Sequence, residues 1–265
     1  MRIGDTKTTV IIGLGKTGLS CIQYLLKQGK QVVAIDTREN PPGLSEVKNI
    51  PVYTGGWHPE ILNQASTIVL SPGLSLKEPC LVEARQKGIP IIGDIELFAR
   101  VAKAPVIAIT GSNAKSTVTT LVGEMARAAG LDVRVGGNIG TPALDLLGDS
   151  EPDLYVLELS SFQLETTESL HPAVATILNI TPDHLDRYES FKEYKAAKQR
   201  IYHNAKIAIY NPKDEHTYPT RHCERSDAIQ GDAFAMTKTI SWRTITAKVP
   251  RAAPNPNAPT SPIKT

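Results

Sequence analysis

The sequence predicts an α/β protein with two parallel-sheet domains, the first of which is Rossmann-like. Three observations support this prediction. Runs of β-branched residues that end in glycine recur along the chain, beginning with TTVIIGLG at 8–15. Amphipathic stretches with helical spacing separate these runs, as crossover helices do between parallel strands. A second series of the same kind begins with APVIAITG at 104–111.

The first domain is predicted to span residues 1–93. Its first run has the composition of a strand buried on both faces, and KTGLSCIQYLLKQG then carries apolar residues at helical spacing up to Gly29. Further strands are predicted in QVVAID, in STIVLSPG at 66–73 and in IPIIGD at 89–94. CLVEARQKG is an amphipathic stretch between the last two.

The second domain is predicted to span residues 94–217. Its first strand leads into the helix STVTTLVGEMARAAG, for which Gly130 is a suitable C-terminal cap. Three more strands are expected, in DLYVLELS (153–160), AVATILNIT (173–181) and KIAIYN (206–211).

A later helix is predicted in SFKEYKAAKQRIYHNA. Ser190 and Glu193 have the spacing of a capping box at its start. Tyr194, Lys198 and Ile201 lie on roughly one face of this helix.

Residues 218–265 follow a different pattern. They show no sustained period, and five prolines crowd their end: Pro250, Pro254, Pro256, Pro259 and Pro262. We expect this end of the tail to be disordered.

The composition favours a globular protein that binds small ligands. The 29 basic and 27 acidic residues leave a net charge of +2, which predicts neither a nucleic-acid partner nor a polybasic membrane anchor. Cys21, Cys80 and Cys223 have no CxxC spacing, so neither a disulfide framework nor a zinc site is indicated. The scattered cysteines fit a reducing cytosol, and no apolar span is long enough to cross a bilayer, so we expect a cytoplasmic protein without a membrane partner. We also expect a monomer.

The first glycine-rich loop is GLGKTG, with Gly13, Gly15 and Gly18 between a predicted strand and helix. Asp36 ends the next strand, where dinucleotide-binding folds place a ribose-binding acid. The pattern allows a nicotinamide dinucleotide site, a site for another nucleotide diphosphate, or merely a tight turn. Its physical content is close backbone approach and free N–H groups at a helix N-terminus.

The second loop, TGSNAKST, follows a β-branched strand and supplies Lys115 and Ser116. This is the pair that P-loops use for phosphate oxygens and Mg²⁺. The loop departs from GxxxxGK[ST], because Ile109 and Ala114 stand at the glycine positions. A strand–turn–helix corner with a solvated lysine is the alternative interpretation.

A longer series of segments resembles the Mur ligase family. The loop is similar to the T-G-[ST]-N-G-K-[ST]-T loop that binds ATP in that family. The segments VIIGLGKTGLSC, DTRENPPGL, SPGLSL, GDIELF, GSNAKSTVTTLVGEMA, GGNIGTPAL, YVLELSSFQLETT, ILNITPDHLDRY and YKAAKQRIY resemble, in order and spacing, the first two domains of the D-glutamate-adding members. The resemblance covers residues 8–217 and implies a P-loop-type ATP-binding domain as the second domain.

The resemblance implies that the first domain binds a UDP-linked substrate. The residues implied as contacts to the UDP are Gly13, Leu14, Gly15, Lys16, Thr17, Asp36, Thr37, Ser71, Pro72 and Gly73. Asn138, Ser160 and Gln163 are implied, more loosely, as contacts to the muramoyl-alanine part.

The second domain would then bind ATP and Mg²⁺. The residues implied at the nucleotide are Gly111, Ser112, Asn113, Ala114, Lys115, Ser116 and Thr117, and those implied at the metal are Ser116, Glu158, His184 and Lys198. Lys115, His184 and Lys198 are the implied catalytic residues. Taken without the resemblance, Glu158 would be a solvated or capping residue and His184 a turn residue.

Lys198 would by default be a solvated helical lysine or a partner of Tyr194 or Glu193. The resemblance makes it a carbamylated lysine. A carbamate is an anionic oxygen ligand that helps to hold a second Mg²⁺, whereas an ammonium would repel the metal.

Two departures from the family put activity in question. Alanine stands at position 114, where the family has glycine, and we expect this to weaken ATP binding. The family also has a third domain, whereas RHCERSDAIQGDAFAMTKT resembles peptides read from short interspersed repeat DNA. This suggests that an insertion or frameshift near Tyr218 replaced the natural continuation, a hypothesis that resequencing of the locus would test.

The implied reaction is the ATP-dependent addition of D-glutamate to UDP-N-acetylmuramoyl-L-alanine through an acyl phosphate. A remnant that binds the UDP-linked substrate without chemistry is the second interpretation. A nicotinamide-dependent oxidoreductase is the third, and Lys115, Ser116 and Lys198 give it no support.

Overall fold

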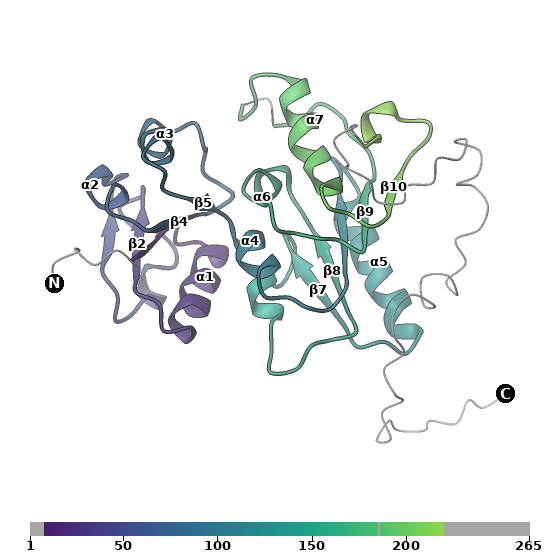
Figure 1. The fold of residues 1–265 in the computed structure, drawn as a ribbon, viewed down its shortest axis with the longest axis horizontal. Coiled ribbons are helices and arrows are strands. Elements are labelled where there is room, and N and C mark those ends of the chain that lie inside the picture. Colours follow the sequence, from purple (N-terminus) through teal and green to yellow (C-terminus); the bar gives the residue numbers. More distant parts are fainter. Residues whose placement is uncertain (1–7, 185, 220–265) are drawn as a thin grey trace. The chain divides into compact units, whose positions relative to one another are not determined.

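The computed structural model describes residues 8–184 and 186–219, and these residues form two parallel sheets (Figure 1). The first sheet has the order β3-β2-β1-β4-β5. Its strands are β1 (Thr9–Ile12), β2 (Val32–Asp36), β3 (Val52–Thr54), β4 (Thr67–Leu70) and β5 (Ile91–Ile92). Thr9 is in register with Val32 on one side and with Thr67 on the other. This confirms the predicted Rossmann-like fold class of the first domain.

Helices connect the strands of the first sheet. They are α1 (Lys16–Lys27), the 3-10 helix η1 (Leu44–Glu46), α2 (Pro59–Leu62) and α3 (Pro79–Gln86). In α1 the apolar spacing buries Cys21, Ile22 and Leu25 against the sheet. The helix ends at Lys27, and Gly29 then has a φ of +68°, which suits glycine.

The second sheet has the order β10-β9-β6-β8-β7 and is also parallel. Its strands are β6 (Val106–Thr110), β7 (Val133–Gly137), β8 (Leu154–Glu158), β9 (Val174–Ile177) and β10 (Ala208–Tyr210). The central strand β6 lies between β8 and β9, with Ile109 in register with Glu158 and Thr110 in register with Ile177. The carboxyl ends of these three strands therefore meet at one edge, where α/β proteins place their sites.

The helices of the second sheet are α4 (Asp94–Ala99), α5 (Lys115–Ala128), α6 (Ser161–Glu165) and α7 (Phe191–Gln199), with the 3-10 helices η2 (Ala143–Leu146), η3 (Arg200–Tyr202) and η4 (Glu215–Thr217). Gly130 follows α5 with a φ of +86°, which confirms it as the terminating glycine. At α7, Ser190 accepts a hydrogen bond from the N–H of Glu193, as predicted. The carboxylate of Glu193 instead accepts from the N–H of Glu189 and pairs with Lys77.

Two strands, β3 and β7, were not predicted from the sequence. Both are edge strands, so their residues are less buried than those of the central strands. β3 has only three residues, all half-buried, and β7 ends in two glycines. Neither segment therefore has the continuous apolar run that marks a buried parallel strand.

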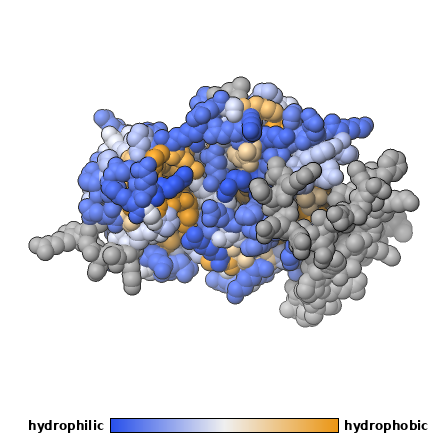
Figure 2. Space-filling view, turned by 45° about the horizontal axis from the view of Figure 1, so that its top comes forward, coloured by the Kyte–Doolittle hydropathy of each residue, from blue (hydrophilic) through white to orange (hydrophobic). Residues whose placement is uncertain are grey.

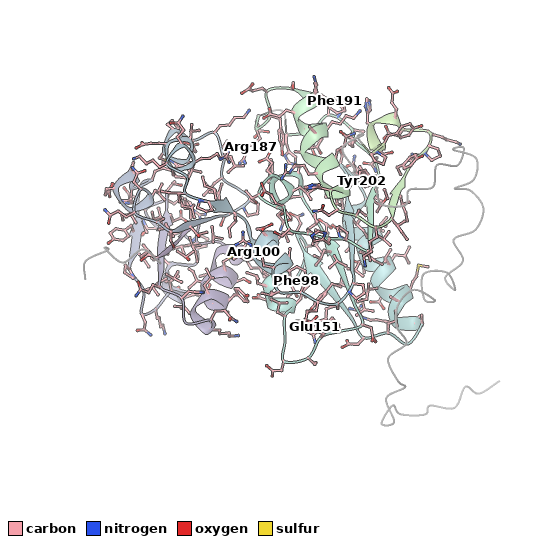
Figure 3. All side chains as sticks on the ribbon, in the orientation of Figure 1. Phe98, Arg100, Glu151, Arg187, Phe191 and Tyr202 are labelled. Atoms are coloured by element: carbon pink, nitrogen blue, oxygen red, sulfur yellow. The ribbon has the colours of Figure 1, made fainter. Side chains whose placement is uncertain are left out.

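Helix α4 packs on the second sheet. The ring of Phe98, labelled in Figure 3, meets the ring of Tyr155 in β8 edge to face, with centroids 5.0 Å apart. Glu96 is buried and accepts hydrogen bonds from the N–H groups of Glu168 and Ser169, both at 2.8 Å. This supports our placing Asp94 and the residues after it in the second domain, although the boundary itself stays a prediction.

On the face shown in Figure 2, the surface formed by the described residues is mostly hydrophilic, with smaller apolar areas. In the part of the chain that the structure describes, no helix has the length and apolar character needed to cross a membrane. The tail predicted at residues 218–265, with the insertion or frameshift suggested near Tyr218, lies outside the described residues except for residues 218 and 219.

Candidate functional site

The phosphate-loop candidate lies between β6 and α5. Helix α5 begins at Lys115, and no side chain caps its N-terminus. Ala114 takes the N-cap position with φ +63° and ψ +7°, in the left-handed region. Gly111 could not become alanine without crowding, because a Cβ there would lie 3.2 Å from Cβ of Leu178. The loop thus presents the open N-terminus of a 14-residue helix.

The loop that follows β9, residues 178–181, holds the phosphate-loop candidate in place. The N–H of Asn113 donates to Oδ1 of Asn179 at 2.9 Å, and the N–H of Ser112 donates to the Asn179 carbonyl, also at 2.9 Å. The Ser112 hydroxyl lies 3.0 Å from both the Thr181 carbonyl and the Tyr194 hydroxyl. The two loops therefore behave as one unit.

Lys115 and Ser116 lie on the first turn of α5. Nζ of Lys115 folds back to donate to the Ser112 carbonyl at 3.0 Å. The side chains of Asn113, Ser116 and Thr117 are exposed beside it. A half-buried lysine over the loop fits phosphate binding better than a freely solvated charge does.

Lys198 is buried, with only 2% of its surface exposed. Its Nζ donates to the Gly111 carbonyl at 2.9 Å and lies 4.8 Å from the centre of the Tyr194 ring. Burial and, to a lesser extent, the charge of Lys115 lower the pKa of Lys198 to about 7, against the opposing effects of Asp183 and Glu158. The solvated-lysine alternative is wrong for this position.

Glu158 ends β8 and is 1% exposed. Its Oε1 accepts from Nδ2 of Asn138 at 2.7 Å, and its backbone carbonyl accepts from the Asn138 N–H. Oε2 is buried and has no hydrogen-bond partner among the described residues. A buried carboxylate oxygen without a donor is costly unless a cation or another donor meets it, so a solvated Glu158 is excluded.

His184 has a φ of +53° and an exposed side chain. Its ring centre lies 5.0 Å from that of Phe162 and 6.1 Å from that of Tyr194. Its Nε2 lies 3.5 Å from Oδ2 of Asp183. The backbone therefore agrees with the turn interpretation, while the ring stays close to the Lys198–Tyr194 pair.

The residues proposed for Mg²⁺ fit a cation in part. Oε2 of Glu158 is the observation in favour. Within residues 8–184 and 186–219, however, no group of three or more His, Cys, Asp or Glu side chains is arranged to hold a metal. Further ligands would have to include a hydroxyl such as that of Ser116, a modified Lys198 or phosphate oxygens.

The first glycine loop is built tightly. Gly13 has a φ of +100°, and a Cβ there would lie 2.6 Å from Oγ of Ser71. A Cβ on Gly18 would overlap the Gly13 carbonyl oxygen. A Cβ on Gly15 would meet no atom within 4 Å, although Gly15 is the N-cap of α1. Packing within the protein thus explains Gly13 and Gly18 but not Gly15.

Asp36 is buried beneath this loop. Its Oδ2 accepts from the N–H of Leu14 at 2.7 Å, and the Arg38 guanidinium donates to both carboxylate oxygens at 2.9 and 2.8 Å. Burial alone would raise the pKa of Asp36, but the hydrogen bonds from Arg38 and Leu14 lower it to about 2. Both oxygens of the Asp36 carboxylate therefore already accept hydrogen bonds within the protein, one of them from the loop.

The other predicted contacts in the first domain lie around the loop. Thr17, Thr37, Ser71 and Pro72 are half-buried, Gly73 and Lys16 are exposed, and Leu14 is buried. Nζ of Lys16 donates to the Gly140 carbonyl.

Ser160 and Gln163 form the capping box of α6. The Ser160 hydroxyl accepts from the Gln163 N–H, and Oε1 of Gln163 accepts from the Ser160 N–H, both at 3.1 Å. Gln163 is buried, whereas Asn138 is exposed. The roles of these three residues at a substrate stay predictions.

Three residues near the site, Asn179, Thr181 and Arg187, were not predicted as site residues. The first two follow β9, and their polar character at a strand end was the available signal. The Arg187 guanidinium donates to the Gly73 and Leu74 carbonyls at 2.9 and 2.7 Å and covers the Phe162 ring. Only the folded chain reveals that Arg187 holds the segment after β4 that contains Ser71, Pro72 and Gly73.

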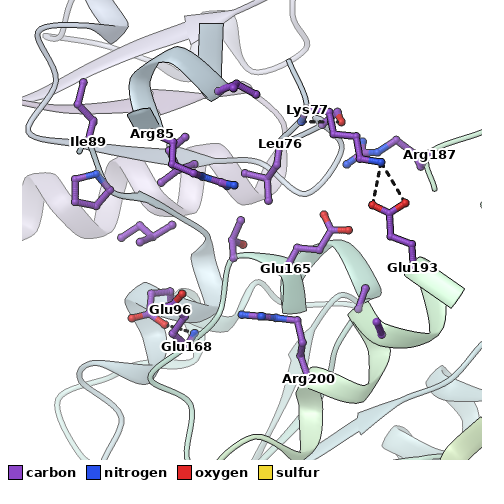
Figure 4. Close-up of a pocket in the computed structure, with 18 of the residues that line it drawn as sticks. Leu76, Lys77, Arg85, Ile89, Glu96, Glu165, Glu168, Arg187, Glu193 and Arg200 are labelled. Carbon is purple, nitrogen blue, oxygen red and sulfur yellow. Dashed lines mark hydrogen bonds and ion pairs between the residues drawn. The ribbon is translucent and has the colours of Figure 1, made fainter. Parts of the chain in front are cut away.

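A cavity of about 1120 Å³ contains none of the predicted site residues (Figure 4). Its charged side chains are mostly engaged: Lys77 pairs with Glu193, Arg100 pairs with Glu96, and Arg200 donates to the Leu164 and Thr167 carbonyls. Size alone therefore does not locate the chemistry, and the strand-end loops remain the better candidate.

Comparison with known families identifies the fold's relatives. The model described as Mur ligase MurD-like, N-terminal domain, matches residues 7–93, and the Mur ligase middle domain matches residues 109–241. The chain belongs to the Mur ligase family. Members of this family are ATP-dependent amide-bond ligases, and this membership argues against the nicotinamide interpretation of the first loop.

Two relatives of this Mur ligase chain are UDP-N-acetylmuramoylalanine–D-glutamate ligases. That of Haemophilus influenzae (strain ATCC 51907) is 55% identical over 219 residues, which cover 82% of this chain and 50% of that protein. That of Escherichia coli O6:K15:H31 (strain 536) is 58% identical over 217 residues, which cover 81% and 49%. The chain thus spans about half the length of the curated relatives it matches.

A solved structure supports the fold. The UDP-N-acetylmuramate:L-alanyl-gamma-D-glutamyl-meso-diaminopimelate ligase from Neisseria meningitides aligns with a TM-score of 0.53 and 17% identity. The alignment covers 79% of this chain and 72% of that one.

Proposed function

We propose that this chain provides the substrate-binding and ATP-binding domains of a ligase that adds D-glutamate to UDP-N-acetylmuramoyl-L-alanine. The observation that carries the proposal is the buried Lys198, hydrogen-bonded to Gly111 in the loop that also presents Lys115. A lysine buried behind a helix N-terminus is costly unless the site uses it. The relatives described above support the choice of substrate.

The first loop is proposed as the UDP site. Gly15 is the N-cap of α1, and its missing side chain leaves the backbone N–H groups of the helix approachable by a diphosphate. Asp36 holds the loop through Leu14. Asn138 and Ser160 are proposed as contacts to the muramoyl-alanine part.

The loop TGSNAKST, between β6 and α5, is proposed as the ATP site. The substrate carboxylate would attack the γ-phosphorus with ADP as the leaving group, and the D-glutamate amine would then attack the acyl carbon. The amine loses a proton, and inorganic phosphate leaves. Lys115 would stabilise the charge on the transferring phosphoryl group, and the loop would orient it.

Mg²⁺ is the proposed metal, with Glu158, Ser116, His184 and Lys198 as candidate ligands. When bound, it would neutralise phosphate charge. Because the pKa of Lys198 is about 7, a large share of its amine is neutral near neutral pH and available to react with CO₂ to form a carbamate. This function requires ATP and UDP-linked precursors, so we propose the cytoplasm as its compartment and a monomer as its form.

A non-catalytic substrate-binding protein is the second candidate. Ala114 favours it, because its methyl group sits in a left-handed N-cap at the mouth of the phosphate loop. Calorimetry with UDP-N-acetylmuramoyl-L-alanine tests the first loop. A phosphate-release assay with ATP, Mg²⁺ and D-glutamate then separates the two candidates: phosphate release supports the ligase, and binding without release supports the second candidate.

A further inference from the structure

The side chain of Gln163 links two separate elements. Its Nε2 donates to Oδ2 of Asp94 at 2.9 Å, while its Oε1 accepts from the Ser160 N–H at 3.1 Å. Asp94 and Gln163 are both buried, so water does not compete for either group. Asp94 is the first residue of α4, and Ser160 is the N-cap of α6.

The chain around Asp94 is held close to α6. The N–H of Gly93 donates to the Thr166 carbonyl at 3.3 Å, and a Cβ on Gly93 would overlap Oγ1 of Thr166. Asp94 thus has little freedom to move away from Gln163.

Asp94 lies among acidic rather than basic groups. The Cys21 thiol of α1 is close enough for the Asp94 and Asp145 carboxylates to raise its pKa, and Glu96 lies on α4 itself. Oδ1 of Asp94 has no partner among the described residues. Burial raises the pKa of Asp94 to about 6, so at pH 7.5 the carboxylate is the acceptor for Gln163.

Ser160 lies two residues after Glu158, whose side chain and carbonyl both hold Asn138. We propose that Asp94 is a positioning residue: through Gln163 it fixes the loop 158–160, and thereby the affinity for the muramoyl-alanine part of the substrate. This inference rests on the proposed function. Asp94 itself need not touch the ligand.

The test compares Asp94→Ala, Asp94→Asn and Glu96→Ala at pH 7.5. Glu96→Ala is the matched control, since Glu96 is a buried acid on the same helix that binds residues 168 and 169 instead of Gln163. The first readout, hydrogen exchange of the 158–164 backbone, needs no ligand. We expect faster exchange in Asp94→Ala, near-normal exchange in Asp94→Asn, whose amide oxygen still accepts from Gln163, and no change there in Glu96→Ala.

The second readout is calorimetry with UDP-N-acetylmuramoyl-L-alanine and with a non-hydrolysable ATP analogue. Asp94→Ala should weaken the first ligand about tenfold and leave the second within about twofold. Unchanged exchange, or equal effects of Asp94→Ala and Glu96→Ala, overturns the inference. Absence of binding by the unaltered chain counts against the proposed function instead, while the exchange result still decides the role of Asp94. If Asp94→Ala does not fold, Gln163→Glu removes the Nε2 donor to Asp94 while keeping an oxygen that can accept from the Ser160 N–H.

Discussion

Nζ of Lys198 lies 2.9 Å from the carbonyl oxygen of Gly111, so a residue of α7 is bonded directly to the loop that opens α5. This bond joins two segments that are 87 residues apart in the sequence. It places a titratable amine behind the phosphate-loop candidate, where its protonation affects both stability and site chemistry.

Lys198 should make the stability of the fold increase with pH above neutrality. The pKa of Lys198 is about 7 in the fold and near 10.4 in an unfolded chain, so between these values the unfolded state binds more protons. The free-energy cost of burying the protonated Lys198 amine is paid in full below about pH 7 and decreases as pH rises toward 10. Urea unfolding at pH 7 to 9.5 should show this slope, and Lys198→Met should remove most of it.

Lys192→Met is the control for this measurement, because Lys192 is an exposed lysine on the same helix. A slope that survives in Lys198→Met, or disappears in Lys192→Met, contradicts the assignment.

Ala114→Gly should stabilise the protein by about 1 kcal/mol, because glycine adopts the left-handed region without the penalty that a Cβ brings. The same change should strengthen ATP binding, measured by nucleotide titration. Ala128→Gly, at the exposed last residue of the same helix, should have the opposite effect on stability, of at most about 1 kcal/mol. Equal ATP affinities of Ala114→Gly and the unaltered chain would show that the methyl group is tolerated.

The other non-glycine residues with positive φ support this argument. Among residues 8–184 and 186–219 they are Asn49, His58, His184 and Asn204. Asn and His are the residue types that visit this region most readily after glycine. Ala114 lacks any such side chain, so the strain there has no local compensation.

Gly15→Ala and Gly18→Ala should separate ligand binding from folding. Alanine at position 18 should destabilise the fold by about 2 kcal/mol or more, because its Cβ would overlap the Gly13 carbonyl. Alanine at position 15 has open space and should cost at most about 1 kcal/mol, yet it should weaken the UDP-linked substrate. Thermal melts and calorimetry measure the two effects, and full substrate affinity in Gly15→Ala would refute the placement of the diphosphate.

Asp36 should make the first domain sensitive to acid. Its pKa is about 2 in the fold and near 3.9 when unfolded, so its contribution is present above about pH 4 and is lost as pH falls toward 2. Since Arg38 is half exposed, we expect a contribution on the order of 1–2 kcal/mol. Asp36→Asn should lose this amount at pH 6 and about half of it at pH 3, whereas exposed Asp149→Asn should change neither value.

The sequence was sufficient to predict the elements with continuous apolar runs. The strands β1, β2, β6, β8 and β9 all lie inside the predicted segments, because strands covered on both faces need such runs. The edge strands β5 and β10 also lie inside predicted segments, because each has its own short apolar run. The edge strands β3 and β7 have no such run, so their composition carried no signal.

The site was predictable only where local chemistry marked it. The loop with Lys115 follows from its own residues, and the family resemblance pointed to Lys198. The burial of Lys198, the anchoring of Ser112 by Thr181 and the Asp94–Gln163 bond depend on long-range packing. Neither local spacing nor composition encodes which of these polar groups meet.

The packing of Phe98 on Tyr155 has a practical consequence for dissecting this chain. A recombinant fragment that starts at Ala104 would expose the Tyr155 side of the second sheet to solvent. It would also leave the backbone N–H groups of residues 168 and 169 without their acceptor, Glu96. Expression of the second sheet by itself therefore has to begin upstream of Asp94, even though its first strand lies more than ten residues later.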